Sequence, residues 1–160
     1  MDTGSVVSFL QESIYLIVVL GIFVVIALAK GKQTLINIIL GLYFGLLLTL
    51  QFPYFDLIAK SSSAKTQSII MLIVFAAFTF FSFLLFNHLM PREFDEKVFE
   101  GFGKKLLFAF GATILVMVFS FHVLPVTEFL SPGTPIQILF SSADYFFWWL
   151  LVLLVSLYLL

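Results

Sequence analysis

The chain has 160 residues, of which 62% are hydrophobic and 11% are charged, and its formal net charge is −1. Soluble domains carry about 25% charged residues, and a chain of this length could not bury so much apolar surface in one aqueous core. The absence of cysteine excludes thiol catalysis and Cys-ligated metals, and the weak net charge gives no general attraction to nucleic acid. The composition therefore predicts one integral membrane domain over residues 1–160.

Five apolar runs follow one another along the chain. A transmembrane helix needs about 20 apolar residues to cross a hydrocarbon core about 30 Å thick. The first four runs are of roughly this length, and they lie at about residues 9–29, 35–50, 69–89 and 106–124. They predict an all-α, polytopic helical membrane protein.

The fifth run closes the chain at Leu160, and its start decides whether it is long enough to span. In "SSAD" we expect Ser141 to be the N-cap, with Asp144 near the positive end of the helix dipole. A helix from Ser142 is then about 28 Å long, and we predict a fifth transmembrane helix. The alternative is four spans plus a half-inserted or interfacial C-terminal segment.

The basic residues are unevenly distributed between the connections. With the N-terminus outside, the outer loop after the second run contains only Lys60 and Lys65. The inner connections then contain Lys30, Lys32, Arg92, Lys97, Lys104 and Lys105. Because cytoplasmic loops carry an excess of Lys and Arg, we predict an outside N-terminus and, if the fifth run spans, an inside C-terminus.

Small and polar residues in the second run share one face of the predicted helix. Asn37, Gly41 and Gly45 recur at intervals of four. The two glycines let another helix approach closely, and Asn37 can hydrogen-bond across the contact. Gly111 begins a comparable face in the fourth run. We favour packing within this chain over contact with a partner protein, but the spacing leaves both open.

Four hydroxyl side chains lie inside the third and fourth runs, and they are Thr79, Ser82, Thr113 and Ser120. Serine and threonine in helices can donate to the backbone carbonyls of their own helix. We expect these four to do so, which means that none of them requires a substrate.

The inner segment "PREFDEKVFEGFGKK" contains Phe94, Val98 and Phe102 at intervals of four. This spacing predicts a short amphipathic helix on the membrane surface. Gly101 and Gly103 allow a sharp change of direction, after which the lysine pair anchors the next span at the headgroups. The alternative is a docking site for a cytosolic or membrane partner.

The ionisable residues give two hypotheses about chemistry. His88 and His122 are predicted at opposite membrane faces, so they cannot share a metal ion, and we expect no metal or cofactor. Ionisable groups at membrane depth are often functional, so Asp56, His122, Glu128 and Asp144 define an alternative, the acidic outer vestibule of a small channel or transporter. No nucleophile–base pair can be assembled, so we expect no enzymatic activity.

The order of these features resembles the colicin V production family of small membrane proteins. The similar stretches are "KGKQT", "NIILGLYFG" and "FDEKVFEGFGKKLLFAFGATILV", within about residues 9–124. Three features depart from the family pattern. Lys32 stands where an arginine usually follows the glycine, the second basic-glycine pair near the fourth run is absent, and the "FFWWLLVLLVSLYLL" tail is unlike the family's usual polar C-terminus. The resemblance implies a bacterial inner-membrane accessory protein of secretion or envelope homeostasis, and no catalytic residues carry over.

The sequence thus favours a membrane scaffold or accessory subunit. Such a protein acts through helix–helix contacts and through its inner face. Its expected partners are the lipid bilayer and either other membrane proteins or a second copy of itself. The channel or transporter is the alternative hypothesis.

Overall fold

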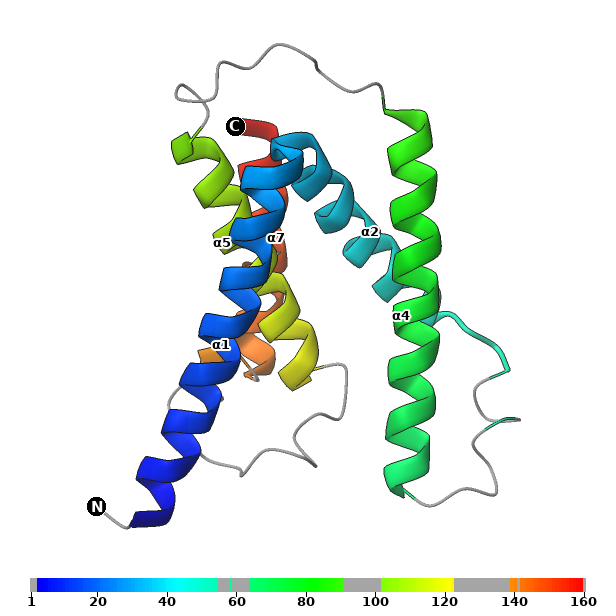
Figure 1. The fold of residues 1–160 in the computed structure, drawn as a ribbon. Coiled ribbons are helices and arrows are strands. Elements are labelled where there is room, and N and C mark those ends of the chain that lie inside the picture. Colours follow the sequence, from blue (N-terminus) through cyan, green and yellow to red (C-terminus); the bar gives the residue numbers. More distant parts are fainter. Residues whose placement is uncertain are drawn as a thin grey trace.

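A computed structural model of the protein describes residues 3–54, 58, 64–90, 102–122, 139–140 and 142–159. Long helices dominate these ranges, and no strand occurs in them. The helices are α1 (Thr3–Lys30), α2 (Lys32–Leu50), α4 (Ala64–Leu89), α5 (Phe102–His122) and α7 (Ala143–Leu159) (Figure 1). The predicted all-α polytopic membrane fold is confirmed.

Four of these helices, α1, α2, α4 and α5, are long and apolar enough to cross a membrane. The apolar part of α7 is shorter, from Tyr145 to Tyr158. The whole of α7, from Ala143 to Leu159, has 17 residues and is about 26 Å long. The carbonyl of Ser142 accepts the N–H groups of Tyr145 and Phe146, at 3.2 and 3.1 Å, whereas Ser141, the expected N-cap, lies outside the described residues. Asp144 is the second residue of α7.

A single residue, Gly31, separates α1 from α2. Its φ of 83° lies in the left-handed region that favours glycine. The Gly31 N–H still donates to the Ala27 carbonyl at 3.0 Å, and the Thr34 hydroxyl donates to the Lys30 carbonyl at 3.2 Å. Both bonds satisfy carbonyls at the end of α1 that would otherwise lack partners. The chain therefore reverses at once, and α2 runs obliquely away from α1 toward α4 (Figure 1).

The helices α1 and α5 form an antiparallel pair. The Tyr15 hydroxyl and Ser120 Oγ lie 3.0 Å apart, and toward the other end of the pair Ala27 and Ala109 are both buried. The helix α7 lies on another side of α5. A Cβ added to Gly111 of α5 would come 3.2 Å from Leu153 Cδ2 of α7. These contacts place α7 beside the middle of α5.

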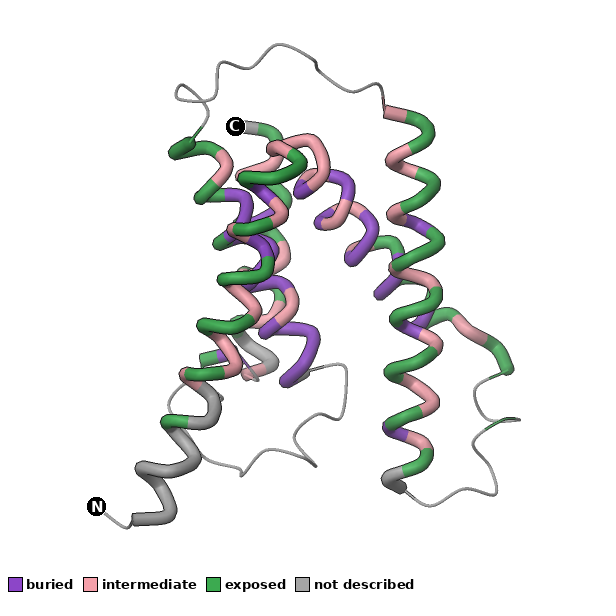
Figure 2. Tube along the Cα trace, viewed as in Figure 1, coloured by how far each residue is buried: buried purple, intermediate pink, exposed green. Residues whose placement is uncertain are grey.

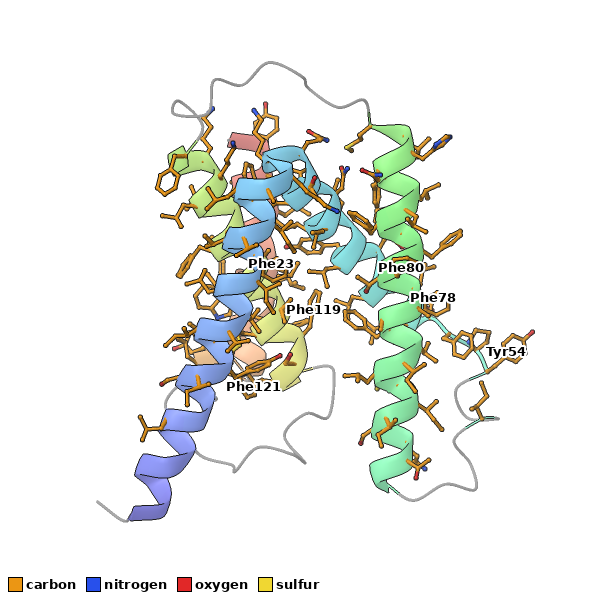
Figure 3. The ribbon with its side chains drawn as sticks, in the orientation of Figure 1. Phe23, Tyr54, Phe78, Phe80, Phe119 and Phe121 are labelled. Atoms are coloured by element: carbon orange, nitrogen blue, oxygen red, sulfur yellow. The ribbon has the colours of Figure 1, made fainter. Side chains whose placement is uncertain are left out.

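Burial is greatest in α2 and α5 (Figure 2). About half of each of these spans is buried, 44% and 50%, compared with 11% for the spans of α1 and α4. Phe119 of α5 is in edge-to-face contact with Tyr43 of α2 and with Phe75 of α4, at centroid distances of 6.4 and 5.8 Å. The side chain of Phe119 lies on the side of α5 that faces α4 (Figure 3). The centre of the bundle is therefore α2 with α5, and the other helices pack around them.

Candidate functional site

A row of small and polar residues at intervals of four runs along α2, and we refer to it as the α2 stripe. Its members are Gln33, Asn37, Gly41, Gly45 and Thr49. All except Gln33 are buried. The sequence pattern identified its three central members. Gln33 and Thr49 were missed, although the same spacing extended in both directions would have found them.

The two glycines of the stripe lie against the backbone of α4. A Cβ on Gly41 would lie 3.1 Å from the backbone nitrogen of Phe83 and 3.2 Å from its Cα. A Cβ on Gly45 would lie 2.8 Å from the Cα of Thr79 and 2.9 Å from its backbone nitrogen. Real Cβ atoms essentially never come within 3.0 Å of such atoms, so the Gly45 contact requires glycine. Ridges formed by residues four apart pack with oblique crossing angles, which agrees with the course of α2 across α4 (Figure 1).

The polar members of the stripe bond locally and to the end of α4. The Gln33 amide donates to Asn37 Oδ1 and to Met90 Sδ, each at 3.4 Å. The Thr49 hydroxyl donates to the Gly45 carbonyl at 2.7 Å. Because a polar group in lipid must find its partners within the protein, these bonds allow the stripe to lie in a membrane-spanning helix.

The four hydroxyl side chains of α4 and α5 do not behave alike. Thr113 donates to the Ala109 carbonyl at 2.8 Å, as expected. The expectation is wrong for Ser120, which bonds to Tyr15 on α1 instead. It is also wrong for Thr79, whose buried hydroxyl has no hydrogen-bond partner among the described residues. Thr79 faces Gly45, so the unpaired hydroxyl lies at the close α2–α4 contact.

The predicted helix-packing residues belong to two contacts. Asn37, Gly41 and Gly45 lie on the stripe, whereas Gly111 lies against Leu153 of α7. Next to this second contact, the Tyr43 hydroxyl of α2 donates to the Leu150 carbonyl of α7 at 2.7 Å. Sequence reasoning missed Tyr43, because a bond to a backbone carbonyl 107 residues away leaves no spacing signal.

The start of α5 differs from the predicted glycine turn. Phe102 is the first residue of α5, so it does not end a separate surface helix, and Gly103 lies in the first helical turn rather than in a hinge. Lys104 and Lys105 are also in the helix. The helix begins earlier than its apolar residues because backbone hydrogen bonds do not require apolar side chains. Phe94, Val98 and Gly101 lie outside the described residues.

The predicted outer vestibule is only partly described. His122 is the last residue of α5 and Asp144 is near the start of α7, and these two helix ends lie at the same end of the bundle (Figure 1). The side chains of both residues, and all of Asp56 and Glu128, lie outside the described residues. His88, in the last turn of α4, lies at the opposite end of the bundle from the end of α5 (Figure 1).

No protein-family model, curated protein or solved structure matches this chain. The feature with the most definite geometry is the α2 stripe, which holds α4 at the edge of the bundle.

Proposed function

We propose that this chain is a membrane scaffold or accessory subunit that acts through contacts between transmembrane helices and through its inner face. The observation that carries the proposal is the attachment of α4, which packs mainly on α2 and has only 11% of its span buried. A helix held on one side presents most of its surface to its surroundings. A transmembrane helix of another protein can contact that surface without displacing any contact within this chain.

The outward surface of α4 supports this proposal by its composition. It consists of large apolar side chains with exposed fractions between 42% and 64%, which are Ile69, Leu72, Ile73, Phe80, Phe81, Leu84, Leu85 and Leu89. Association between helices in lipid depends on van der Waals packing. The rigid phenylalanine rings offer large areas for such packing at little entropic cost.

The distribution of lysines supports an outside N-terminus. The end of α1 and the starts of α2 and α5 share one end of the bundle (Figure 1). Lys30, Lys32, Lys104 and Lys105 lie at these helix ends, and cytoplasmic segments are enriched in such residues. Following the resemblance to the colicin V production family, we propose the bacterial inner membrane as the location, and secretion or envelope homeostasis as the process.

Photocrosslinking from α4 tests the scaffold proposal. The chain has no cysteine, so Phe81→Cys provides a single attachment point for a photoreactive maleimide on the outward surface. Ser82→Cys is the matched control, because Ser82 is the next residue and is only 3% exposed. In native membranes we expect a protein adduct from position 81 and little or none from position 82.

The mass of the adduct identifies the kind of contact. An adduct of twice 18.1 kDa indicates self-association, and any other discrete mass above that of the chain indicates a different subunit. Lipid adducts alone, from both Phe81→Cys and Leu85→Cys, would show that lipid covers this surface and would contradict the proposal.

A further inference from the structure

Four lysines on three helices lie at one end of the bundle, and we refer to them as the lysine end. Lys30 is the last residue of α1 and Lys32 is the first residue of α2. Lys104 and Lys105 lie near the start of α5. These helix ends come together at the same end of the bundle (Figure 1).

The packing of α1 on α5 sets the relative depth of these lysines. The Tyr15–Ser120 hydrogen bond fixes the register of this antiparallel pair. Lys30 lies 15 residues after Tyr15, and Lys105 lies 15 residues before Ser120. Because both helices rise about 1.5 Å per residue, the two lysines lie at the same level. Ala27 and Ala109 are 1% and 0% exposed, so the helices remain packed close to this end.

The backbone adds to the positive charge of the lysine end. The N-terminal end of a helix carries a partial positive charge, which acidic residues usually offset. The first turns of α2 and α5 contain no acidic residue, and Gly31 makes no side-chain cap on α2. Lysines occupy these turns instead, so the charges of the side chains and the partial charges of the helix N-termini are both positive.

The segment 91–100 between α4 and α5 lies outside the described residues, and its sequence gives only its formal charge. Residues 91–100 contain four acidic and two basic residues, which are Glu93, Asp95, Glu96 and Glu100 against Arg92 and Lys97. Its formal charge is therefore −2, compared with +4 from the lysines of the lysine end. By sequence alone, the four lysines carry more charge than this segment.

Exposed apolar side chains lie next to the lysine end. Leu28 precedes Lys30 on α1 and is 57% exposed, and Leu106 and Leu107 follow Lys105 on α5 with exposed fractions of 44% and 48%. A free phosphate ion has no apolar part that could contact these leucines. The headgroup of a phospholipid can lie at the lysines while its acyl chain lies along these leucines.

We propose that the lysine end is a binding site for an anionic phospholipid, with the headgroup phosphate held by Lys30, Lys32, Lys104 and Lys105. Each ammonium group supplies hydrogen-bond donors to the phosphate oxygens. Basic clusters at the ends of transmembrane helices attract anionic headgroups in this way. The proposal requires that the chain lies in a membrane and does not depend on the scaffold function.

The test measures lipid selectivity with spin-labelled phosphatidylglycerol and phosphatidylcholine in vesicles that contain the purified protein. We expect the motionally restricted fraction to favour phosphatidylglycerol by at least about threefold. Lys104→Gln with Lys105→Gln should remove most of this preference. Lys104→Arg with Lys105→Arg should keep it, which shows that the loss reflects charge rather than misfolding. Equal selectivity for the two lipids in the unmodified protein would overturn the proposal.

A matched control and a competitor identify the source of the selectivity. Lys60→Gln with Lys65→Gln removes the same charge from two lysines elsewhere in the chain, one between α2 and α4 and one at the start of α4, and it should leave the preference unchanged. A loss as large as that of the 104/105 pair would mean that net charge alone is responsible, which contradicts a site. Excess inorganic phosphate should not displace the lipid, and complete displacement would show a phosphate site in place of a lipid site.

Discussion

At Gly45 the backbone of α4 occupies the space in which a side chain would begin. We expect Gly45→Ala to lower the free energy of unfolding by about 1–3 kcal/mol, because the added methyl group would overlap the Thr79 backbone and push α4 away. Gly41→Ala should cost less, because its nearest α4 atoms are at 3.1–3.3 Å. Unfolding by sodium dodecyl sulfate in mixed micelles measures both values.

Gly21 provides the control for this prediction. It is exposed on α1, and a Cβ there would meet nothing within 4 Å. Gly21→Ala should therefore be neutral or stabilising by up to about 1 kcal/mol, through helix propensity alone. If Gly45→Ala is as stable as Gly21→Ala, the close contact between α2 and α4 does not exist in the membrane.

At Thr79, whose hydroxyl has no described partner, we expect a substitution to raise the free energy of unfolding, in contrast to Gly45→Ala. Thr79→Val removes a buried polar atom that has no described partner, and we expect a gain in stability of about 1 kcal/mol. Thr113→Val is the matched change at a hydroxyl that does donate a bond, and it should cost about 0.5–1.5 kcal/mol. The same micelle titration compares them, and a loss at position 79 would indicate a partner for the hydroxyl.

At the scale of the helices, α7 depends on few contacts with the rest of the bundle. The Tyr43 hydroxyl bonds to the Leu150 carbonyl, so Tyr43→Phe should weaken the docking of α7 by about 0.5–1.5 kcal/mol. The chain has two tryptophans, Trp148 and Trp149, and both lie in α7. Tryptophan emission therefore reports on α7 alone, and it should change at a lower denaturant concentration in this variant.

A second tyrosine provides the control, because it shows whether loss of a tyrosine hydroxyl by itself changes the tryptophan emission. Tyr158 is also in α7 but is 89% exposed. Tyr158→Phe should leave the emission and its denaturation midpoint unchanged. Equal shifts in the two variants would mean that the Tyr43 bond does not hold α7.

The helices were largely predictable from the sequence, whereas their contacts were not. The apolar runs at 35–50 and 69–89 correspond to α2 and α4, and the differences lie at the polar ends, where backbone hydrogen bonding continues beyond the apolar residues. The spacing of Gly41 and Gly45 indicated a contact face but not its partner, since many helices can fit a glycine face. Tyr43 gave no signal at all, because its acceptor is a backbone carbonyl.

At the scale of the whole molecule, the path of the chain across the membrane gives a labelling pattern. We expect Ser62→Cys to react with an impermeant maleimide from outside, and Glu100→Cys to react from inside. If α7 spans, Tyr158→Cys should react from the same side as Glu100→Cys, because the end of α7 lies at the lysine end (Figure 1). Labelling of Tyr158→Cys from outside would instead support the interfacial alternative.

The one-residue junction at Gly31 has a consequence for how the protein enters the membrane. With one residue between them, the end of α1 and the start of α2 lie at the same membrane face, and we expect the two helices to be inserted together as a hairpin. Gln33, Asn37 and Thr49 then lie in the hairpin before α4 has been synthesised. During that interval the α2 stripe has no α4 backbone against it. The earliest membrane-inserted form of the chain is thus the one in which α2 most needs a temporary neighbour.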